Sequence, residues 1–222
     1  DIFLPIQKLL ITMKLKKKNY LMDYKYAKKL FGKNIIGPDE FKNFPSTFKL
    51  PKITEEIDIH IDNLDYSKYI LLFGPNLMED GSKLNINKML NIFGKKSSKN
   101  QVAFYNQDWY LREDFAINQL GNKWYLVQKE IVNDSRGATP SYEFKNNLPS
   151  AVLCTFLFFT WWFKTKEVLW ENDYVWCSDF DNQGDQIYVG KYRDLINKKR
   201  SGYSIHRHLS IRKNYGCIRS FC

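Results

Sequence analysis

Residues 149–166, PSAVLCTFLFFTWWFKTK, form the stretch that decides the fold of this chain. From Ala151 to Phe163 it carries no charge, and its apolar side chains surround a helix on nearly all sides instead of forming one stripe. A helix of that kind is buried on most sides, and Pro149 suits its first turn. At about 1.5 Å per residue, these 13 residues fall short of a hydrocarbon core of about 30 Å. We therefore predict an interior helix that extends to about Lys166, and no membrane span.

Shorter segments on both sides of this helix predict strands and further helices. Apolar runs, or alternating apolar and polar residues, are typical of strands and occur at 57–61, 69–73, 124–132, 173–178, 186–192 and 203–206. Helical spacing occurs at 20–31, 84–93 and 112–118. A polar turn at 179–185 separates two of the strands, and residues 214–219 form a closing segment. The predicted class is α+β, with the buried helix packed on a small twisted antiparallel sheet after a mixed, partly helical N-terminal region.

The run Gly94–Asn100 (GKKSSKN) is the strongest loop signal in the chain. We place a domain boundary there. Residues 1–100 then form a mixed α/β region of unassigned role, and residues 101–222 form a second module with its core at 148–222.

Four short motifs in the last third of the chain occur in a recognisable order. They are Leu148-Pro149-Ser150, Trp176-Cys177-Ser178, Ile187-Tyr188-Val189-Gly190 and Gly216-Cys217-Ile218-Arg219. This order resembles the C-type-lectin-like fold of the formylglycine-generating enzyme (sulfatase-modifying factor) superfamily, and within it the variable proteins diversified by retroelements. One departure is that Val152-Leu153-Cys154 stands where the family usually has an acidic residue followed by Trp.

The resemblance implies a ligand surface made by exposed side chains of the last strands and loops. Tyr and Arg are frequent in binding hot spots because they offer large contact area and planar donors. The alternative for each residue is that it points into the core, since side chains alternate along a strand. The predicted ligand-binding residues are Tyr188, Tyr192, Arg193, Tyr203, His206, Arg207, His208, Arg212 and Tyr215.

The enzyme chemistry of that superfamily does not transfer to this sequence. Its oxidase members use two cysteines five residues apart before the closing strand, whereas Cys217 lies within that strand and Cys222 after it. No Ser or Cys has a recognisable His and acid partner. The acidic turn from Asp179 to Asp185 lacks the bidentate Glu of a calcium loop, because Gly190 stands at that position. We therefore predict no enzyme, no cofactor and no metal site.

The charge of the chain points to acidic partners. Lys and Arg total 34 against 24 Asp and Glu, which gives a net charge of +10, and the segments 8–33 and 186–222 each carry nine basic residues against one acid. Basic segments with interleaved aromatics favour nucleic acid, although positive charge also simply maintains solubility. Ile2–Ile11 has its basic residues on the wrong side for a secretory signal. We predict a non-catalytic binding protein with a protein or glycan ligand, cytoplasmic or released without a classical signal peptide; the alternative is a basic nucleic-acid-associated protein.

Overall fold

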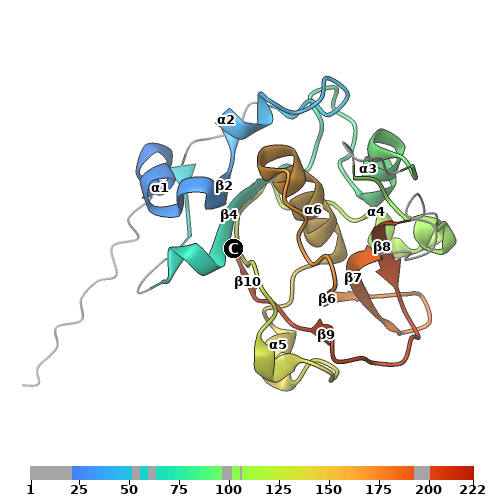
Figure 1. Cartoon of the computed structure of the whole chain (residues 1–222). Helices are drawn as coiled ribbons and strands as arrows, with labels where there is room; N and C mark the ends of the chain where they lie inside the picture. Colours follow the sequence, from blue (N-terminus) through green and yellow to red (C-terminus); the bar gives the residue numbers. More distant parts are fainter. Residues whose placement is uncertain (1–21, 52–55, 60–63, 97–101, 106, 193–200) are drawn as a thin grey trace, which may run out of the picture.

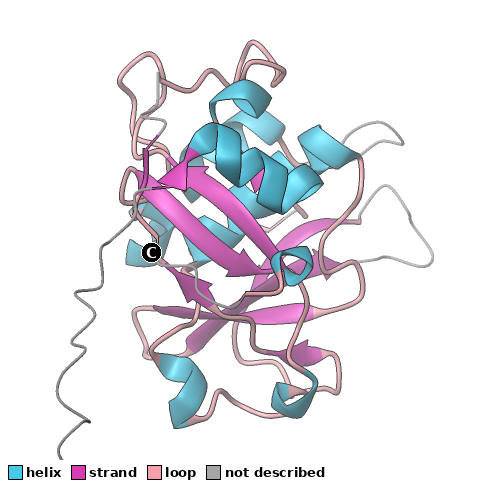
Figure 2. Cartoon of the chain, turned by 90° about the vertical axis from the view of Figure 1, so that its left-hand side faces the viewer, coloured by secondary structure: helices cyan, strands magenta, loops and turns pink. Residues whose placement is uncertain are grey.

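The computed structural model describes residues 22–51, 56–59, 64–96, 102–105, 107–192 and 201–222, and it confirms the α+β class. Its strands form a two-stranded sheet and two four-stranded sheets. Strands cross the middle of the molecule, and helical segments lie above and below them (Figure 2). The central helix α6 lies between the two larger sheets (Figure 1).

The first four-stranded sheet has the order β10-β5-β4-β2. Its centre is β4 (Tyr69–Gly74), the predicted buried apolar run, which pairs antiparallel with β5 (Lys123–Gln128). The edges are β2 (Ile35–Ile36), parallel to β4, and β10 (Ser220–Phe221), antiparallel to β5. We predicted β5 to continue to Val132, but it ends at Gln128, and a 3-10 turn, η5 (Asn133–Ser135), follows after four intervening residues.

The second four-stranded sheet has the order β8-β7-β6-β9. The strands β6 (Tyr174–Phe180), β7 (Gln186–Tyr192) and β8 (Gly202–His206) are antiparallel, as predicted, but β9 (Tyr215–Gly216) runs parallel to β6. Gly190 in β7 is required by space, because a Cβ there would lie 2.2 Å from the carbonyl oxygen of Asp173.

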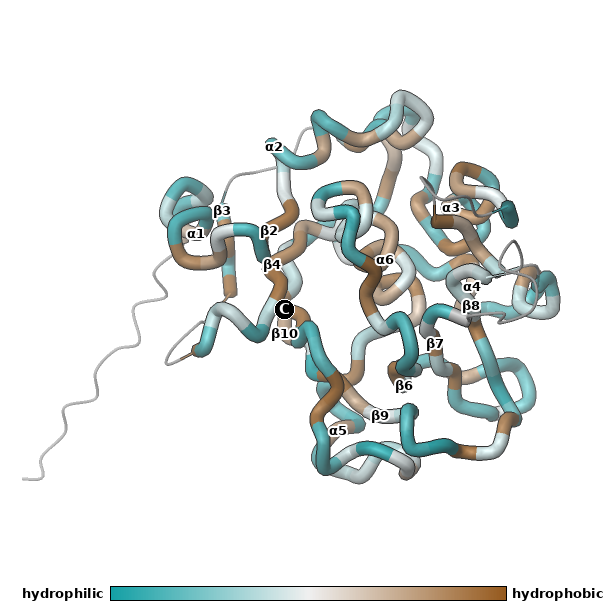
Figure 3. Tube along the Cα trace, viewed as in Figure 1, coloured by the Kyte–Doolittle hydropathy of each residue, from teal (hydrophilic) through white to brown (hydrophobic). Residues whose placement is uncertain are grey.

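The helix α6 (Ala151–Thr165) confirms the predicted interior helix. Ser150 caps it by accepting from the N–H of Leu153 at 3.3 Å. The hydroxyls of Thr155 and Thr160 donate to carbonyl oxygens one turn earlier, each at 2.7 Å, so they remain hydrogen-bonded in an apolar environment. Much of α6 and β4 is hydrophobic, whereas the peripheral turns are mostly hydrophilic (Figure 3). Among the described residues, no helix has the length and apolar character needed to cross a bilayer.

The N-terminal elements pack against the first sheet and α6: α1 contacts β2 and β4, and α3 contacts α6. The helix predicted at 20–31 begins later than expected, as α1 (Tyr24–Phe31), because Asp23 caps it and Met22–Asp23 form a strand; residues 20 and 21 lie outside the described part. The helix predicted at 84–93 is α3 (Ile86–Phe93). Of the strand predicted at 57–61, only Ile57 belongs to a strand, β3 (Glu56–Ile57), which pairs with β1 (Met22–Asp23); residues 58 and 59 are irregular, and residues 60–63 lie outside the described part. Three further helical segments are single turns: α2 (Pro38–Phe41), η2 (Gly32–Asn34) and η3 (Tyr66–Lys68).

The segment between β4 and β5 and the segment before α6 are only partly regular. The helix predicted at 112–118 consists of a 3-10 turn, η4 (Trp109–Arg112), and one α-helical turn, α4 (Asp114–Ile117). An unpredicted turn, α5 (Tyr142–Lys145), precedes α6.

The main hydrophobic core contains residues from both sides of residue 100. It extends from Tyr24 to Ile218 and includes a close aromatic stack of Phe93 on Phe159, with 4.2 Å between ring centroids. The pairing of β4 with β5 also crosses that position. The boundary predicted at residue 100 therefore does not coincide with a break in the packing.

Candidate functional site

Three of the predicted ligand-binding tyrosines are buried, so the expectation that they are exposed was wrong. Tyr203 faces α6, where its hydroxyl bonds to that of Thr155 at 3.0 Å. Tyr188 and Tyr215 lie on the opposite face of the sheet, in a second cluster with Trp176. Both faces of this sheet are covered, so alternation along the strands does not separate interior from exterior positions.

Two other predicted residues cannot be placed in a surface. Tyr192 ends β7, but its side chain lies outside the described part of the structure, and so does the whole of Arg193. The remaining four, His206, Arg207, His208 and Arg212, belong to the end of β8 and the loop that follows it.

The best-organised polar cluster of the described residues surrounds Arg207. Its guanidinium Nη1 lies 2.5 Å from Asp181 Oδ2 and 3.5 Å from Glu113 Oε1. The plane of Trp109 completes the enclosure, with the guanidinium carbon 4.4 Å from the ring centroid. Arginine suits this position because its planar fork bonds carboxylates and stacks on an indole at once. We call Trp109, Glu113, Asp181 and Arg207 the Arg207 site.

Asp181 joins this site to the turn between β6 and β7. Its Oδ1 accepts from the N–H groups of Gln183 and Asp185 at 2.9 and 2.8 Å, and Gly184 adopts a φ of +89° that closes the turn. Burial opposes ionisation of this carboxyl, but the hydrogen bonds from Arg207 and the two N–H groups outweigh it. They hold the pKa of Asp181 below its ordinary value. The carboxylate therefore stays charged at neutral pH as a fixed part of the site.

Trp109 and Glu113 are themselves held by the backbone of neighbouring elements. The indole N–H of Trp109 donates to the carbonyl of Ile205 in β8 at 3.1 Å. Glu113 Oε2 accepts from the N–H of Asn182 at 2.8 Å. The segment 107–113, the β6–β7 turn and the end of β8 are thus tied together around one arginine.

His206 ends β8 directly before Arg207, and its ring is neutral. Its imidazole stacks on Tyr188, with 5.9 Å between centroids, and Nδ1 lies 3.4 Å from the amide nitrogen of Gln107. Burial lowers the pKa of His206 to about 4. Gln107 can then donate to Nδ1, and the same amide accepts from the N–H of Ile205 at 3.4 Å. His206 therefore helps to hold the segment 107–113 against β8, and it is not available to bind a ligand.

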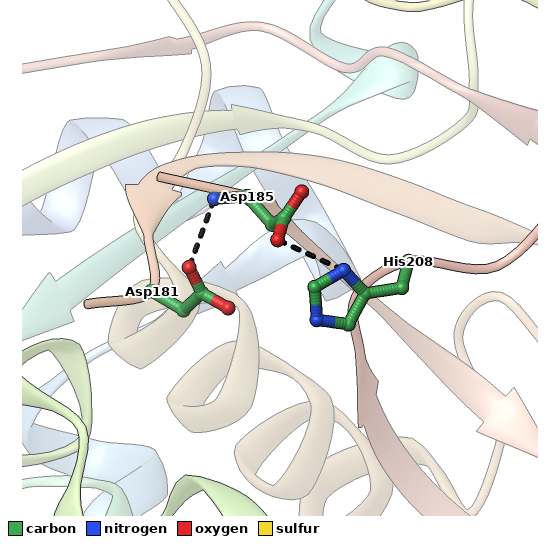
Figure 4. Close-up of side chains that lie close together, drawn as sticks. All are labelled: Asp181, Asp185 and His208. Atoms are coloured by element: carbon green, nitrogen blue, oxygen red, sulfur yellow. Dashed lines mark hydrogen bonds and ion pairs between the residues drawn. The ribbon is translucent and has the colours of Figure 1, made fainter. Parts of the chain in front are cut away.

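His208 lies at the outer edge, where Figure 4 shows it beside Asp185 and Asp181. Its Nδ1 is 2.8 Å from Asp185 Oδ2, and its backbone has a φ of +60°. The donor atoms of the three side chains lie within 4.8 Å of one another, which is the spacing that a shared cation would need. Both oxygens of Asp181 are already bonded, however, one of them to a guanidinium. This donor set suits an ion-pair network within the chain better than a metal centre.

Exposed apolar side chains occur close to members of the Arg207 site along the chain. Phe180 is 53% exposed and precedes Asp181; Ile117 is 58% exposed and ends α4. The two elements are neighbours, because Asn118 hydrogen-bonds the carboxylate of Asp179. Beyond His208, the loop exposes Leu209 and Ile211.

Comparisons with known proteins do not identify the site. No family model, curated protein or solved structure matches the chain. The site is therefore interpreted from its geometry.

Sequence reasoning missed most of the site. The clearest signal in the sequence was the acidic turn 179–185, which we considered as a cation-binding loop. The cation that this turn binds is the chain's own Arg207. Trp109, Glu113, Phe180 and Ile117 carried no comparable signal.

Proposed function

We propose that the protein is a non-catalytic binding protein whose contact surface is the loop 207–213 together with the rim of the Arg207 site. The observation that carries this proposal is that four exposed apolar residues each lie within four residues, along the chain, of a member of the ion-paired Arg207 site. Large apolar side chains that are exposed together and bordered by charge mark interaction surfaces. The apolar members are Ile117, Phe180, Leu209 and Ile211.

The base of this surface supports the proposal because it is fixed before any ligand arrives. Arg207 contacts two carboxylates and an indole at the start of the loop. Two residues later, the N–H of Leu209 donates to the hydroxyl of Tyr188 at 3.1 Å. At the other end, the N–H of Tyr215 donates to the carbonyl of Arg212 at 2.9 Å. A loop held in this way loses less conformational entropy on binding than a free one.

A protein ligand suits this surface better than a glycan. Leu209, Ile211 and Ile117 are aliphatic, and their burial against apolar side chains of a partner is favourable by about 25 cal/mol per Å². Arg212 and Lys213 are exposed beside them and have no ion-pair partner among the described residues, so an acidic rim on the partner would complement them. The resemblance to C-type-lectin-like variable proteins implies a ligand-binding surface on the final strands and loops, for a protein or a glycan.

Nucleic-acid binding is the second candidate, favoured by the same two free cations and by the net charge of +10. The Arg207 guanidinium does not add to it, because two carboxylates neutralise it. The two candidates differ in their response to salt. Binding through phosphates weakens by roughly one log unit per log unit of salt for each phosphate neutralised, whereas apolar contact does not.

Protein, glycan and single-stranded nucleic-acid arrays, screened with the purified chain, would test the proposal. We expect a protein ligand, with loss of binding in the Leu209→Ser/Ile211→Ser double variant. Tyr142→Ser is the matched control, because Tyr142 is 84% exposed and outside this surface. Equal binding by the double variant and the wild type would refute the proposed surface, and a steep salt dependence would favour nucleic acid.

A further inference from the structure

A second feature lies at the far end of α6, about 20 Å along the helix from its Ser150 cap. There a cavity of about 360 Å³ opens between α1, α2 and α6, which is within the range of about 300–1,000 Å³ common for small-molecule sites. Its walls carry two aromatic rings, an amide, two amines and two carboxylates: Phe44, Phe163, Asn43, Lys28, Lys164, Asp39 and Glu40.

Lys164 is the unusual group in this wall. Its side chain is only 18% exposed, and Nζ donates to the carbonyl of Ile35 and lies 3.4 Å from Glu40 Oε1. Burial lowers the pKa of the Lys164 ammonium; Glu40 counteracts this, and the positive charge of Lys28 adds to it. A lysine that is desolvated and near another cation is the form of amine that reacts with carbonyl compounds.

Glu40 is held in a position to assist proton transfer. Its Oε2 accepts from the hydroxyl of Tyr24 at 2.8 Å and from the N–H of Gly37 at 2.9 Å. Oε1 is left to face Lys164. A carboxylate in hydrogen-bond reach of an amine can carry a proton between the amine and a substrate oxygen.

We propose that Lys164 captures small aldehydes or ketones in this cavity as an imine, with Glu40 as the proton carrier and Phe44 and Phe163 as the apolar wall. The neutral Nζ attacks the carbonyl carbon, and a proton passes by way of Glu40 from nitrogen to the former carbonyl oxygen. The carbinolamine then loses water, and a C=N bond replaces the C=O bond. Both hydrogens of the released water come from the amine, and no oxidant or reductant is consumed.

The aromatic wall indicates the class of carbonyl compound. The rings of Phe44 and Phe163 lie 5.6 Å apart at an interplanar angle of 40°, and both line the cavity. A flat apolar group therefore fits better than a sugar. This site and its chemistry are independent of the binding surface proposed at the Arg207 site.

Reductive trapping tests the proposal on the full chain. The protein is mixed with benzaldehyde and sodium cyanoborohydride at pH 7 for short times, and the labelled lysines are located by peptide mapping. We expect Lys164 to be labelled first, ahead of Lys166, which lies two residues away and is exposed. In urea this preference should disappear, because all lysines are then solvated alike.

Variants make the test specific. Lys164→Arg should lose the early labelling, Lys166→Arg should retain it, and Phe44→Trp, which fills the cavity, should slow it. If Lys164→Arg does not fold, the comparison of native and urea-treated wild type still shows whether Lys164 is labelled preferentially in the folded protein. Labelling of Lys164 at the same rate as the exposed lysines, or later, would overturn the proposal.

Discussion

Protonation of His206 should account for a measurable part of the acid sensitivity of this protein. The pKa of His206 in the folded protein is about 4, whereas a histidine in an unfolded chain has a pKa of about 6.5. Between these values the unfolded chain binds a proton that the folded chain does not, so stability falls as the pH decreases. From pH 7 to pH 5 the free energy of unfolding should fall by about 2 kcal/mol, because about 1.5 pH units below the unfolded pKa each cost about 1.36 kcal/mol. Below pH 4 both states are protonated, and this group causes no further change.

Urea unfolding followed by tryptophan fluorescence measures this loss. With a slope near 2 kcal/mol per molar urea, the midpoint should fall by about 1 M between pH 7 and pH 5. His206→Phe keeps an aromatic ring beside Tyr188 and should remove most of that difference. His208→Gln is the matched control and should keep the difference. If His206→Phe shows the same pH dependence as the wild type, the assignment of His206 as a buried neutral ring is incorrect.

Two further substitutions test the packing around the Arg207 site. Arg207→Met should lower the free energy of unfolding by roughly 2–4 kcal/mol, because it leaves the carboxylate of Asp181 buried without its cation; urea unfolding should show partial recovery in Arg207→Lys, and an unchanged midpoint in Arg207→Met would contradict the ion-pair network. Gly190→Ala should cost about 3 kcal/mol or more, because its Cβ would meet a backbone oxygen that cannot move aside. A thermal melt within a degree of the wild type would show that β6 and β7 are not in the register described.

The sequence was most informative where one physical cause dominates. The helix α6 was predicted because its apolar residues surround it completely, and its end was correct within one residue. Pro149, expected in the first turn, lies just before the Ser150 cap. The bounds of β7 were predicted correctly, since a polar turn with a glycine precedes it. Such signals are local, and a single chain displays them directly.

The missed features depend on contacts between distant parts of the chain. Tyr188 and Tyr203 were expected at the surface, but one packs in the cluster with Trp176 and the other on α6. Arg207 appeared as a free cation, yet its partners lie 26 and 94 residues earlier in the chain. Neither arrangement leaves a trace in the local periodicity of the sequence.

The short strand β10 has a consequence for how the protein is synthesised. It borders β5, and the backbone N–H of Gln128 bonds to the carbonyl of Arg219, 91 residues later. At a translation rate of about 5–20 residues per second, roughly 5–20 s pass between the synthesis of β5 and that of β10. During this interval the nascent chain presents the outer backbone groups of β5, which other unfinished chains can pair with. Ribosomes that stall within this stretch would therefore release products prone to aggregation.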